Sequence, residues 1–532
     1  MSTETKKKSL LKSGANLSIL TLVSRILGLL REMTKSAFMG TGPMADAFAV
    51  AFLIPNLLRR LFAENSITVA FIPTLKSYLD VENPDSQENK KTTKEFLSAV
   101  FTVVCFLTSI ITALGILFAP QIIRLFFKNV ADFELTVLLT RIMFIYLVLI
   151  SVAAFFQGML NSVKIFTPAG FTPILFNIII IGFTYFLSKP LQNPAIAMSV
   201  GVTVGGLVQA FFQLPFVLKS KFKFSFLNLK KAFSNKGMKK VMALILPTIV
   251  GMAAYQLNEL VSSSLASNVG VGVLSSLQYS LRLQELVLGV FAVSVGTVIL
   301  PDLSGYAVKK QWTDFQDVLL KAIKVIALIT IPATLFLYIS GEHIITLVYK
   351  ARSFDDESVR LTLTAFNRHV LGLFFIASNR IIAPAFYAQG NTKLPTLAGI
   401  ISFAINITLA TILCRPMKGG GIALALSLAS FVNTALLFFF LRSNENLNIK
   451  TLIGRTIFFT IKILAFSIIA VAPLYFFGEK IFASFTGNGR LISEGVPIFI
   501  NFLIFAAIGT SLLIVTGDKL TKNIIAAVKS KF

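Results

Sequence analysis

Long apolar stretches separated by short polar ones are the dominant pattern of the sequence. A helix that crosses the hydrocarbon core of a bilayer needs about 20 predominantly apolar residues. Fourteen stretches satisfy this length, namely 14–39, 46–75, 96–119, 135–160, 169–188, 194–218, 241–265, 273–302, 316–340, 361–388, 396–414, 419–441, 456–478 and 495–516. The pattern predicts an all-α polytopic membrane protein with 14 transmembrane helices. The second stretch contains Pro55, and we expect the helix to be broken there.

The basic residues between these stretches predict how the chain crosses the membrane. With a cytoplasmic N-terminus, the cytoplasmic tails and loops hold 27 Lys and Arg and the outer loops hold 10, as the positive-inside rule requires. Residues 219–240 contribute eight lysines and no acidic residue. Because an even number of crossings returns the chain to its starting side, both termini are predicted to be cytoplasmic.

The composition excludes several classes of protein. The 532 residues are 55% hydrophobic and 14% charged, with a mean hydropathy of +0.79, whereas soluble domains contain about 25% charged residues. The net charge of +25 would suggest nucleic acid in a soluble protein, but the cytoplasmic loops account for it and no nucleic acid partner is expected. No GxxxxGK[ST] run indicates ATP hydrolysis. With two Cys and two His, neither a metal site nor another cofactor is expected.

Two short motifs recur at nearly the same spacing. The run Pro73-Thr-Leu-Lys-Ser-Tyr78 is echoed by Pro301-Asp-Leu-Ser-Gly-Tyr306, and Gln157-Gly158 is echoed by Gln389-Gly390. Each match lies six apolar stretches apart, which indicates duplication of a six-helix unit. We expect two pseudo-symmetric six-helix lobes with a cavity between them, followed by two C-terminal helices. The predicted divisions are 1–218 (N-lobe), 219–240 (basic cytoplasmic loop), 241–441 (C-lobe) and 442–532 (last two helices and tail).

Two glycine motifs are assigned to helix packing. Gly201 and Gly205 have the GxxxG spacing that lets helices approach closely, and Gly419, Gly420 and Gly421 begin an apolar stretch. Neither motif is expected to bind phosphate.

Twelve Lys and Arg residues lie within or at the ends of the apolar stretches. Lys35, Arg141, Lys321, Lys324 and Lys462 are close enough to stretch ends to extend toward the interface. The others are harder to accommodate, because an unpaired charge at mid-bilayer costs at least about 2.5–3.5 kcal/mol. They include six arginines in the first, second, eighth and tenth stretches: Arg25, Arg31, Arg59, Arg60, Arg282 and Arg380.

Pairing with Glu32, Glu64, Glu259 or Glu285 would make these arginines simple links between helices. However, the cations outnumber those acids, and the duplication places most of them around the central cavity. Because guanidinium groups match phosphate oxygens well, we predict a cavity that binds an anion.

The residues around these arginines resemble one family closely. Ser24-Arg25-Ile-Leu-Gly28 through Arg31, Asp46-Ala-Phe, Pro55-Asn-Leu-Leu-Arg59-Arg60-Leu-Phe-Ala-Glu64 and Tyr279-Ser-Leu-Arg282-Leu-Gln-Glu285 are similar to motifs of the MurJ (MviN) lipid II flippases of the MOP exporter superfamily. The likeness extends from about residue 10 to the last apolar stretch.

This resemblance implies a V-shaped cationic cavity, with a groove from the last two helices for a polyprenyl tail. It implies lipid II, the undecaprenyl-pyrophosphate-linked disaccharide-peptide, as substrate, and a bacterial inner membrane location. The essential arginines of the family fall on Arg25, Arg31, Arg59 and Arg282, and its acid at the start of helix 2 falls on Asp46. Glu32 stands where relatives often have Asp. The eleventh stretch lacks an acid, so a sodium site is not expected.

We therefore expect a lipid II flippase that works by alternating access, without catalytic residues. Arg25, Arg31, Arg59 and Arg282 are predicted to bind the substrate, supported by the cavity charges Glu32, Asp46, Arg60, Glu64, Glu285 and Arg380. Cell-wall synthesis proteins are possible partners.

Three alternative functions remain. The first is another exporter of the superfamily, for lipid-linked O-antigen sugars or for cationic drugs. The second is a membrane-embedded glycosyltransferase or lipid phosphatase, and the third is a non-transporting scaffold. An exporter of cations would need acids in its cavity, an enzyme would need clustered acids at a membrane face, and a scaffold would not need unbalanced buried arginines.

Overall fold

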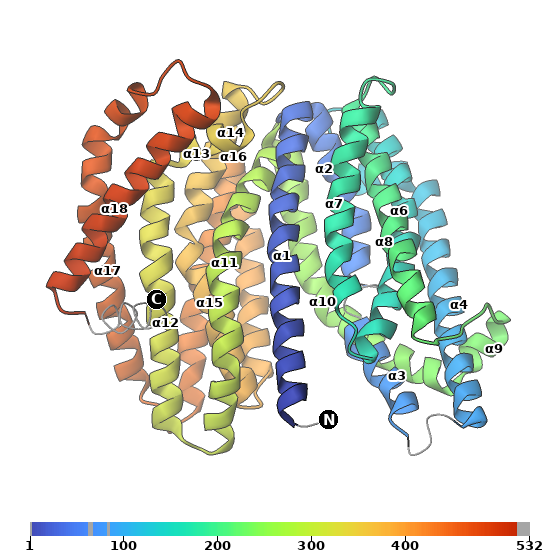
Figure 1. Ribbon diagram of the computed structural model, residues 1–532. Helices are drawn as coiled ribbons and strands as arrows, with labels where there is room; N and C mark the ends of the chain where they lie inside the picture. Colours follow the sequence, from blue (N-terminus) through green and yellow to red (C-terminus); the bar gives the residue numbers. More distant parts are fainter. Residues whose placement is uncertain (1–2, 62–66, 82–85, 519–532) are drawn as a thin grey trace. The chain divides into compact units, whose positions relative to one another are not determined.

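The computed structural model describes residues 3–61, 67–81 and 86–518. Regular secondary structure within these residues is helical, apart from an isolated β-bridge between Ala351 and Phe354. Figure 1 shows the helices, which fall into two compact units, Met1–Ser275 and Ser276–Phe532. The division lies at the start of α11, so α10 is counted with the first unit.

The first unit begins with a helix that is much longer than a membrane span requires. Side chains at several helix starts accept backbone N–H groups from the first turn, which fixes where those helices begin: Ser86, Asp132, Asn193 and Asn235. The elements are α1 (Thr3–Met39), α2 (Pro43–Arg59), the π-helix η2 (Ile67–Phe71), α3 (Ile72–Leu79), α4 (Gln87–Leu117), α5 (Ala119–Phe126), α6 (Phe133–Ser162), α7 (Thr167–Leu187), α8 (Pro194–Lys219), α9 (Leu229–Ser234) and α10 (Lys236–Val269).

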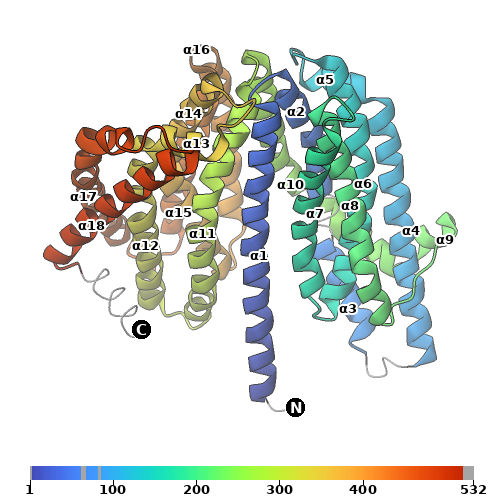
Figure 2. The same ribbon diagram turned by 45° about the horizontal axis from the view of Figure 1, so that its top comes forward.

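Packing in the first unit centres on α6, which contacts α2, α4 and α8, while α7 packs against α8 and α1. Figures 1 and 2 both show α4, α6, α7 and α8 side by side. A Cβ atom at Gly201 would lie 3.1 Å from the Ile180 Cα, and one at Gly205 would lie 2.8 Å from the Phe176 ring. The packing interpretation of this GxxxG motif is therefore confirmed.

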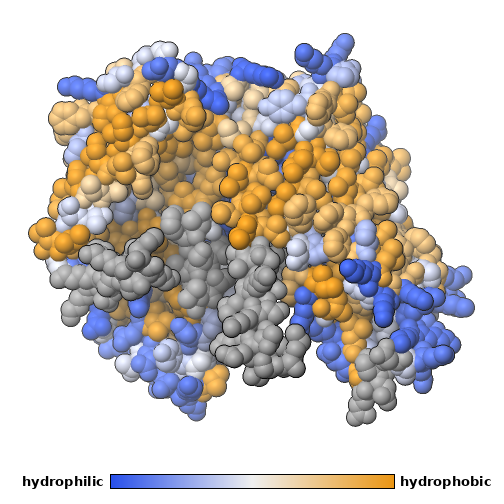
Figure 3. Space-filling view, viewed as in Figure 1, coloured by the Kyte–Doolittle hydropathy of each residue, from blue (hydrophilic) through white to orange (hydrophobic). Residues whose placement is uncertain are grey.

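In Figure 3 the first unit carries apolar side chains over its middle and upper part, and hydrophilic ones toward the lower end, where α9 lies.

The second unit contains the remaining elements. They are α11 (Val273–Val308), α12 (Trp312–Ile339), α13 (Gly341–Tyr349), α14 (Asp356–Leu371), α15 (Leu373–Ala388), α16 (Lys393–Phe440), the 3-10 turn η3 (Leu441–Ser443), α17 (Ile449–Ala483), the π-helix η4 (Leu491–Gly495) and α18 (Val496–Val515).

Eight helices in the described part of the chain are long and apolar enough to cross a membrane, and nine if α14 and α15 count as one span bent by 44°. The eleventh and twelfth predicted stretches share α16, whose backbone breaks at Lys418, with φ 47° and ψ −129°. The prediction that Pro55 breaks the second stretch is wrong, because α2 continues past it to Arg59. Proline removes one hydrogen bond, and the surrounding packed helices hold α2 together across it.

The ends of α6 and α15 have the same local geometry, although the two helices belong to different units. Lys164 and Gly390 adopt left-handed φ values of 63° and 73°. In each case the next residue donates its N–H to a carbonyl five positions back, from Ile165 to Leu160 and from Asn391 to Phe386. Both ends are Schellman motifs. At the end of α15 the left-handed residue is the glycine of Gln389-Gly390, whereas Gln157-Gly158 lies inside α6, before Lys164.

In the second unit α12 packs against α15 and α17, and α17 packs against α18. The Lys462 ammonium on α17 lies 2.9 Å from an Asp518 carboxylate oxygen beyond the end of α18, and the two side chains are 21% and 9% exposed. Asp518 lies just beyond the last predicted stretch, so the pair is compatible with the expectation that Lys462 extends toward the interface. The pair joins the first half of α17 to the chain just beyond the end of α18.

Candidate functional site

The last turns of α1 carry a row of charges on one side of the helix. Arg31 donates to a Glu32 carboxylate oxygen at 2.8 Å, and the two side chains are 20% and 14% exposed. Lys35, four residues after Arg31, is buried, with its ammonium 5.8 Å from the centre of the Phe48 ring. Arg25, two turns earlier, is half-buried. No acidic side chain in the described part of the chain forms an ion pair with Arg25.

Lys35 is the residue that the sequence analysis misjudged, since it was expected to extend out of the membrane. The available signal was its spacing. Residues 31 and 35 are one turn apart and share a face of the helix, so Lys35 belongs with Arg31 rather than with the interface.

The end of α2 presents two adjacent arginines with different partners. The Arg59 Nε donates to the Asn56 Oδ1 at 3.1 Å, whereas Arg60 forms an ion pair of 2.6 Å with Glu259 on α10. Both Arg60 and Glu259 are about one-third exposed, so the pair is partly hydrated. Glu64, the expected partner in this region, lies outside the described residues.

Asp46 lies near the start of α2 and is buried. Its Oδ2 accepts the backbone N–H of Gly272 at 2.6 Å, and its Oδ1 accepts that of Ser275 at 2.9 Å. These N–H groups belong to the first turn of α11, which has no intrahelical acceptor for them. Asp46 is therefore the N-terminal cap of α11, supplied from another helix, where a negative charge also complements the helix dipole.

The second unit holds the remaining predicted site residues. Arg282 and Glu285, one turn apart on α11, are 3.4 Å apart and 30% and 59% exposed. The buried Arg282 Nε–H has no hydrogen-bond acceptor. Arg380 on α15 is exposed on the surface of the chain.

Two features of these residues define their chemistry. Arg31 and Arg282 each have a carboxylate neighbour on their own helix, which keeps the guanidinium charge balanced in an apolar setting. The guanidinium of Arg282 also retains an unused donor, and such donors form short, charge-assisted bonds to oxyanions. Among the described side chains, no cluster of His, Cys, Asp or Glu could hold a metal ion. The Arg282 guanidinium therefore has a donor available for an anion. The predicted site residues are divided between the two units.

The fold is shared with solved structures of helical membrane transporters. A multidrug transporter of the MATE family, in an inward-facing conformation, aligns with 82% of this chain and 99% of its own, with a TM-score of 0.65 at 14% identity. A structure titled lipid II flippase MurJ, in an inward closed conformation, covers 93% of this chain and 98% of its own, with a TM-score of 0.75 at 27% identity.

Sequence comparison identifies the family. The family model described as lipid II flippase MurJ matches residues 35–486. A probable lipid II flippase MurJ from Treponema pallidum is 49% identical over 98% of this chain and 99% of its own length. This chain belongs to the MurJ family of lipid II flippases, and it is a multi-pass helical membrane protein.

Proposed function

We propose that this protein moves lipid II from the inner to the outer leaflet of a bacterial cytoplasmic membrane by alternating access. The chain would cross the membrane fourteen times, with both termini in the cytoplasm. Residues 1–218 and 241–441 would form two six-helix lobes around a cationic cavity, joined by the basic loop 219–240. Residues 442–532 would supply the two C-terminal helices and a cytoplasmic tail.

In this proposal Arg25, Arg31, Arg59 and Arg282 hold the substrate's pyrophosphate. The observation that carries the assignment is the buried Nε–H of Arg282, which has no acceptor. Buried polar groups are nearly always paired, so an unused guanidinium donor in a family of flippases is best explained by a ligand oxygen. Glu32 and Glu285 would balance the charges of Arg31 and Arg282 when the cavity is empty, and Arg60, Glu64, Asp46 and Arg380 would support the cavity.

No step of this transport makes or breaks a covalent bond, so the protein would act without an enzyme's catalytic residues. Its partner would be lipid II within the membrane, together with proteins of cell-wall synthesis, and no nucleic acid. Cationic side chains in the cavity favour this substrate over the cationic drugs carried by other members of the superfamily.

The test is rescue of a bacterium depleted of its own lipid II flippase. Wild-type protein should restore growth, while Arg31→Ala, Arg59→Ala and Arg282→Ala should abolish rescue at normal membrane levels. Loss of a charged hydrogen bond is expected to slow flipping roughly 10- to 100-fold. Lysine at these positions keeps the charge but loses the two-pronged geometry, and should restore growth in part.

The matched control is Arg360→Ala, because Arg360 is 72% exposed and pairs with Glu357 on the same helix turn. This variant should rescue as well as wild type. Growth with all three cavity alanine variants would refute the pyrophosphate assignment. Failure of the wild-type protein itself, at normal levels, would favour a different exporter of the superfamily.

A further inference from the structure

A cavity of about 390 Å³ lies between α15, α16 and α17, and none of the predicted arginines lines it. Its wall is almost entirely apolar and is dominated by aromatic rings, including Phe374 and Phe375 on α15 and Phe431, Phe438 and Phe439 on α16. Phe431 and Phe439 are also exposed on the surface of the chain, so the cavity is open along one side. Its volume is within the range of small-molecule sites, about 300–1,000 Å³.

The cavity is elongated. The lining residues of α16 and η3 run from Phe431 to Arg442, and those of α17 from Ile453 to Ile461, in alternating steps of three positions and one. Such steps mark one face of each helix. At 1.5 Å per residue these faces are about 16 Å and 12 Å long. Apolar faces of this length fit a hydrocarbon chain better than a compact ligand.

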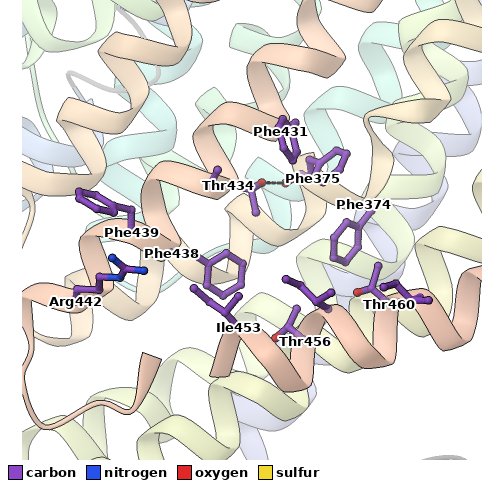
Figure 4. A pocket seen from close by; sticks show the side chains of 13 residues that line it. Phe374, Phe375, Phe431, Thr434, Phe438, Phe439, Arg442, Ile453, Thr456 and Thr460 are labelled. Atoms are coloured by element: carbon purple, nitrogen blue, oxygen red, sulfur yellow. Dashed lines mark hydrogen bonds between the residues drawn. The ribbon is translucent and has the colours of Figure 1, made fainter. Parts of the chain in front are cut away.

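One end of the cavity is cationic. Figure 4 shows Arg442 at one end of the row of lining side chains, with Phe374 and Thr460 at the other. The Arg442 guanidinium lies 5.3 Å from the centre of the Phe439 ring. No carboxylate in the part of the chain that the structure describes forms an ion pair with it. Arg442 follows the end of α16, where the hydropathy pattern places the edge of the membrane.

Two hydroxyl groups on the α17 side of the cavity lack partners. Thr456 is 6% exposed, and neither its Oγ1 nor that of Thr460 has a hydrogen-bond partner. Threonine within a helix ordinarily bonds to the carbonyl four residues earlier, as Thr434 across the cavity does to Ser430. Leaving a buried hydroxyl unpaired is costly, so these two groups indicate an acceptor supplied by a ligand.

We propose that this cavity binds one glycerophospholipid molecule. Arg442 holds the phosphate at the membrane edge, the Thr456 hydroxyl donates to an ester carbonyl one step deeper, and an acyl chain lies between the aromatic faces of α15 and α16 and the apolar face of α17. The bound lipid packs α17 against α15 and α16. No residue of α18 lines the cavity, so this site is separate from a tail groove between the last two helices.

The unpaired hydroxyls decide between two kinds of lipid phosphate. A polyprenyl phosphate carries a phosphate and a hydrocarbon tail but has no ester carbonyl below the phosphate. It would satisfy Arg442 and leave the Thr456 hydroxyl unpaired in an apolar wall. A glycerophospholipid satisfies both groups.

Native mass spectrometry of the purified full-length chain tests the proposal, with phosphatidylglycerol titrated in its ester-linked and ether-linked forms. One ester-linked lipid should remain bound, and Arg442→Gln should weaken its binding about tenfold. Thr456→Val keeps the shape of the side chain but removes the donor, and should abolish an ester-over-ether preference of about three- to tenfold. Ala435→Trp should fill the cavity and release the lipid.

Each variant has a matched control that should bind as wild type does. Arg455→Gln removes an exposed arginine of α17, Thr408→Val removes an exposed hydroxyl of α16, and Leu428→Trp enlarges an exposed side chain of α16; none of these residues lines the cavity. Equal binding of ester and ether lipid by the wild type would overturn the proposal. So would tighter binding of undecaprenyl phosphate at this site, or retention of the lipid by both Arg442→Gln and Thr456→Val. Because Thr456→Val conserves side-chain shape, the test does not depend on the folding of the tryptophan variant. The readout is lipid binding, so it is independent of whether the protein flips lipid II.

Discussion

Asp46 uses both carboxylate oxygens to accept backbone N–H groups at the start of α11. A cap that comes from a distant helix differs from the usual cap, which precedes its own helix by one residue. It ties the beginning of α2 to the beginning of α11 across 226 residues of sequence. The residue is therefore first a structural link, whatever further contribution its charge makes to a cavity.

Replacing Asp46 with Ala should lower stability by about 1–3 kcal/mol, because two buried N–H groups lose their acceptors. Asp46→Asn keeps one acceptor oxygen and should lose less. Thermal unfolding of the purified protein in detergent measures both changes. Asp80→Ala, at an exposed position after α3, is the control and should leave the midpoint unchanged. An unaltered midpoint for Asp46→Ala would contradict the capping role.

The interaction partners of individual charged residues were only partly predictable from the sequence. The pairs Arg31–Glu32 and Arg282–Glu285 lie within one helix turn, so spacing alone suggests them. The Arg60–Glu259 pair and the cap by Asp46 join residues about 200 or more positions apart. Hydropathy and helix periodicity carry no information about which helices become neighbours, so one sequence could indicate that these charges need partners without saying which.

At the scale of elements, α13 forms a junction with the end of α17 and with η4. The His343 Nδ1 lies 2.8 Å from a Glu494 carboxylate oxygen, and its ring stacks on Phe482 with the ring centres 3.4 Å apart. The His343 Nε2 also approaches Glu479, at 3.6 Å, but the Glu479 side chain is 85% exposed. The close contact with Glu494 holds the start of α18 against α13.

Glu494→Gln and His343→Ala should therefore loosen the start of α18. Backbone amide exchange over residues 491–499 is expected to rise roughly five- to tenfold, in proportion to the lost hydrogen bond. Glu479→Gln is the matched control, because an exposed pair at that distance contributes little. Equal exchange in all three variants would show that apolar packing alone fixes this junction.

The sequence located the long helices well, since about 20 apolar residues leave few alternatives in a membrane. It did not indicate the short helices α5, α9 and α13, which occupy stretches assigned to loops. Their apolar residues are too few for a span, and their helical state depends on packing against the long helices beside them. The break predicted at Pro55 was wrong for a related reason: a proline inside a packed helix costs one hydrogen bond, and contacts with neighbouring helices compensate for it.

At the scale of the whole molecule, cysteine labelling tests the proposed orientation of the chain in the membrane. Single cysteines at Asp356 and Asn488 should react with a membrane-impermeant thiol reagent added to intact cells, and a cysteine at Lys223 should react only after the cells are opened. All three positions are exposed on the chain, so burial cannot explain a difference. The native Cys105 and Cys414 are first replaced with Ala. External labelling at Lys223 would reverse the assigned topology.

We propose that the membrane potential drives transport, an inference from charge. Lipid II carries a negative pyrophosphate, and the cell interior is electrically negative, so outward movement is favoured by roughly 2.3 kcal/mol per charge per 100 mV. Dissipating the potential while holding the proton gradient should therefore stall flipping in cells. If the cavity arginines move with the substrate, they cancel part of its charge and the dependence should be weaker. Flipping that continues unchanged would direct attention to a coupling ion instead.

The Lys462–Asp518 pair has a consequence for how the chain is made. During synthesis, Lys462 emerges 56 residues before Asp518, so this lysine enters the bilayer while its carboxylate partner is still unmade. Lysine in an otherwise apolar helix opposes insertion. Stable insertion of α17 should therefore wait for α18, with the hairpin entering as one unit. A nascent chain stopped before residue 518 should leave α17 more open to extraction from the membrane than one stopped just after it.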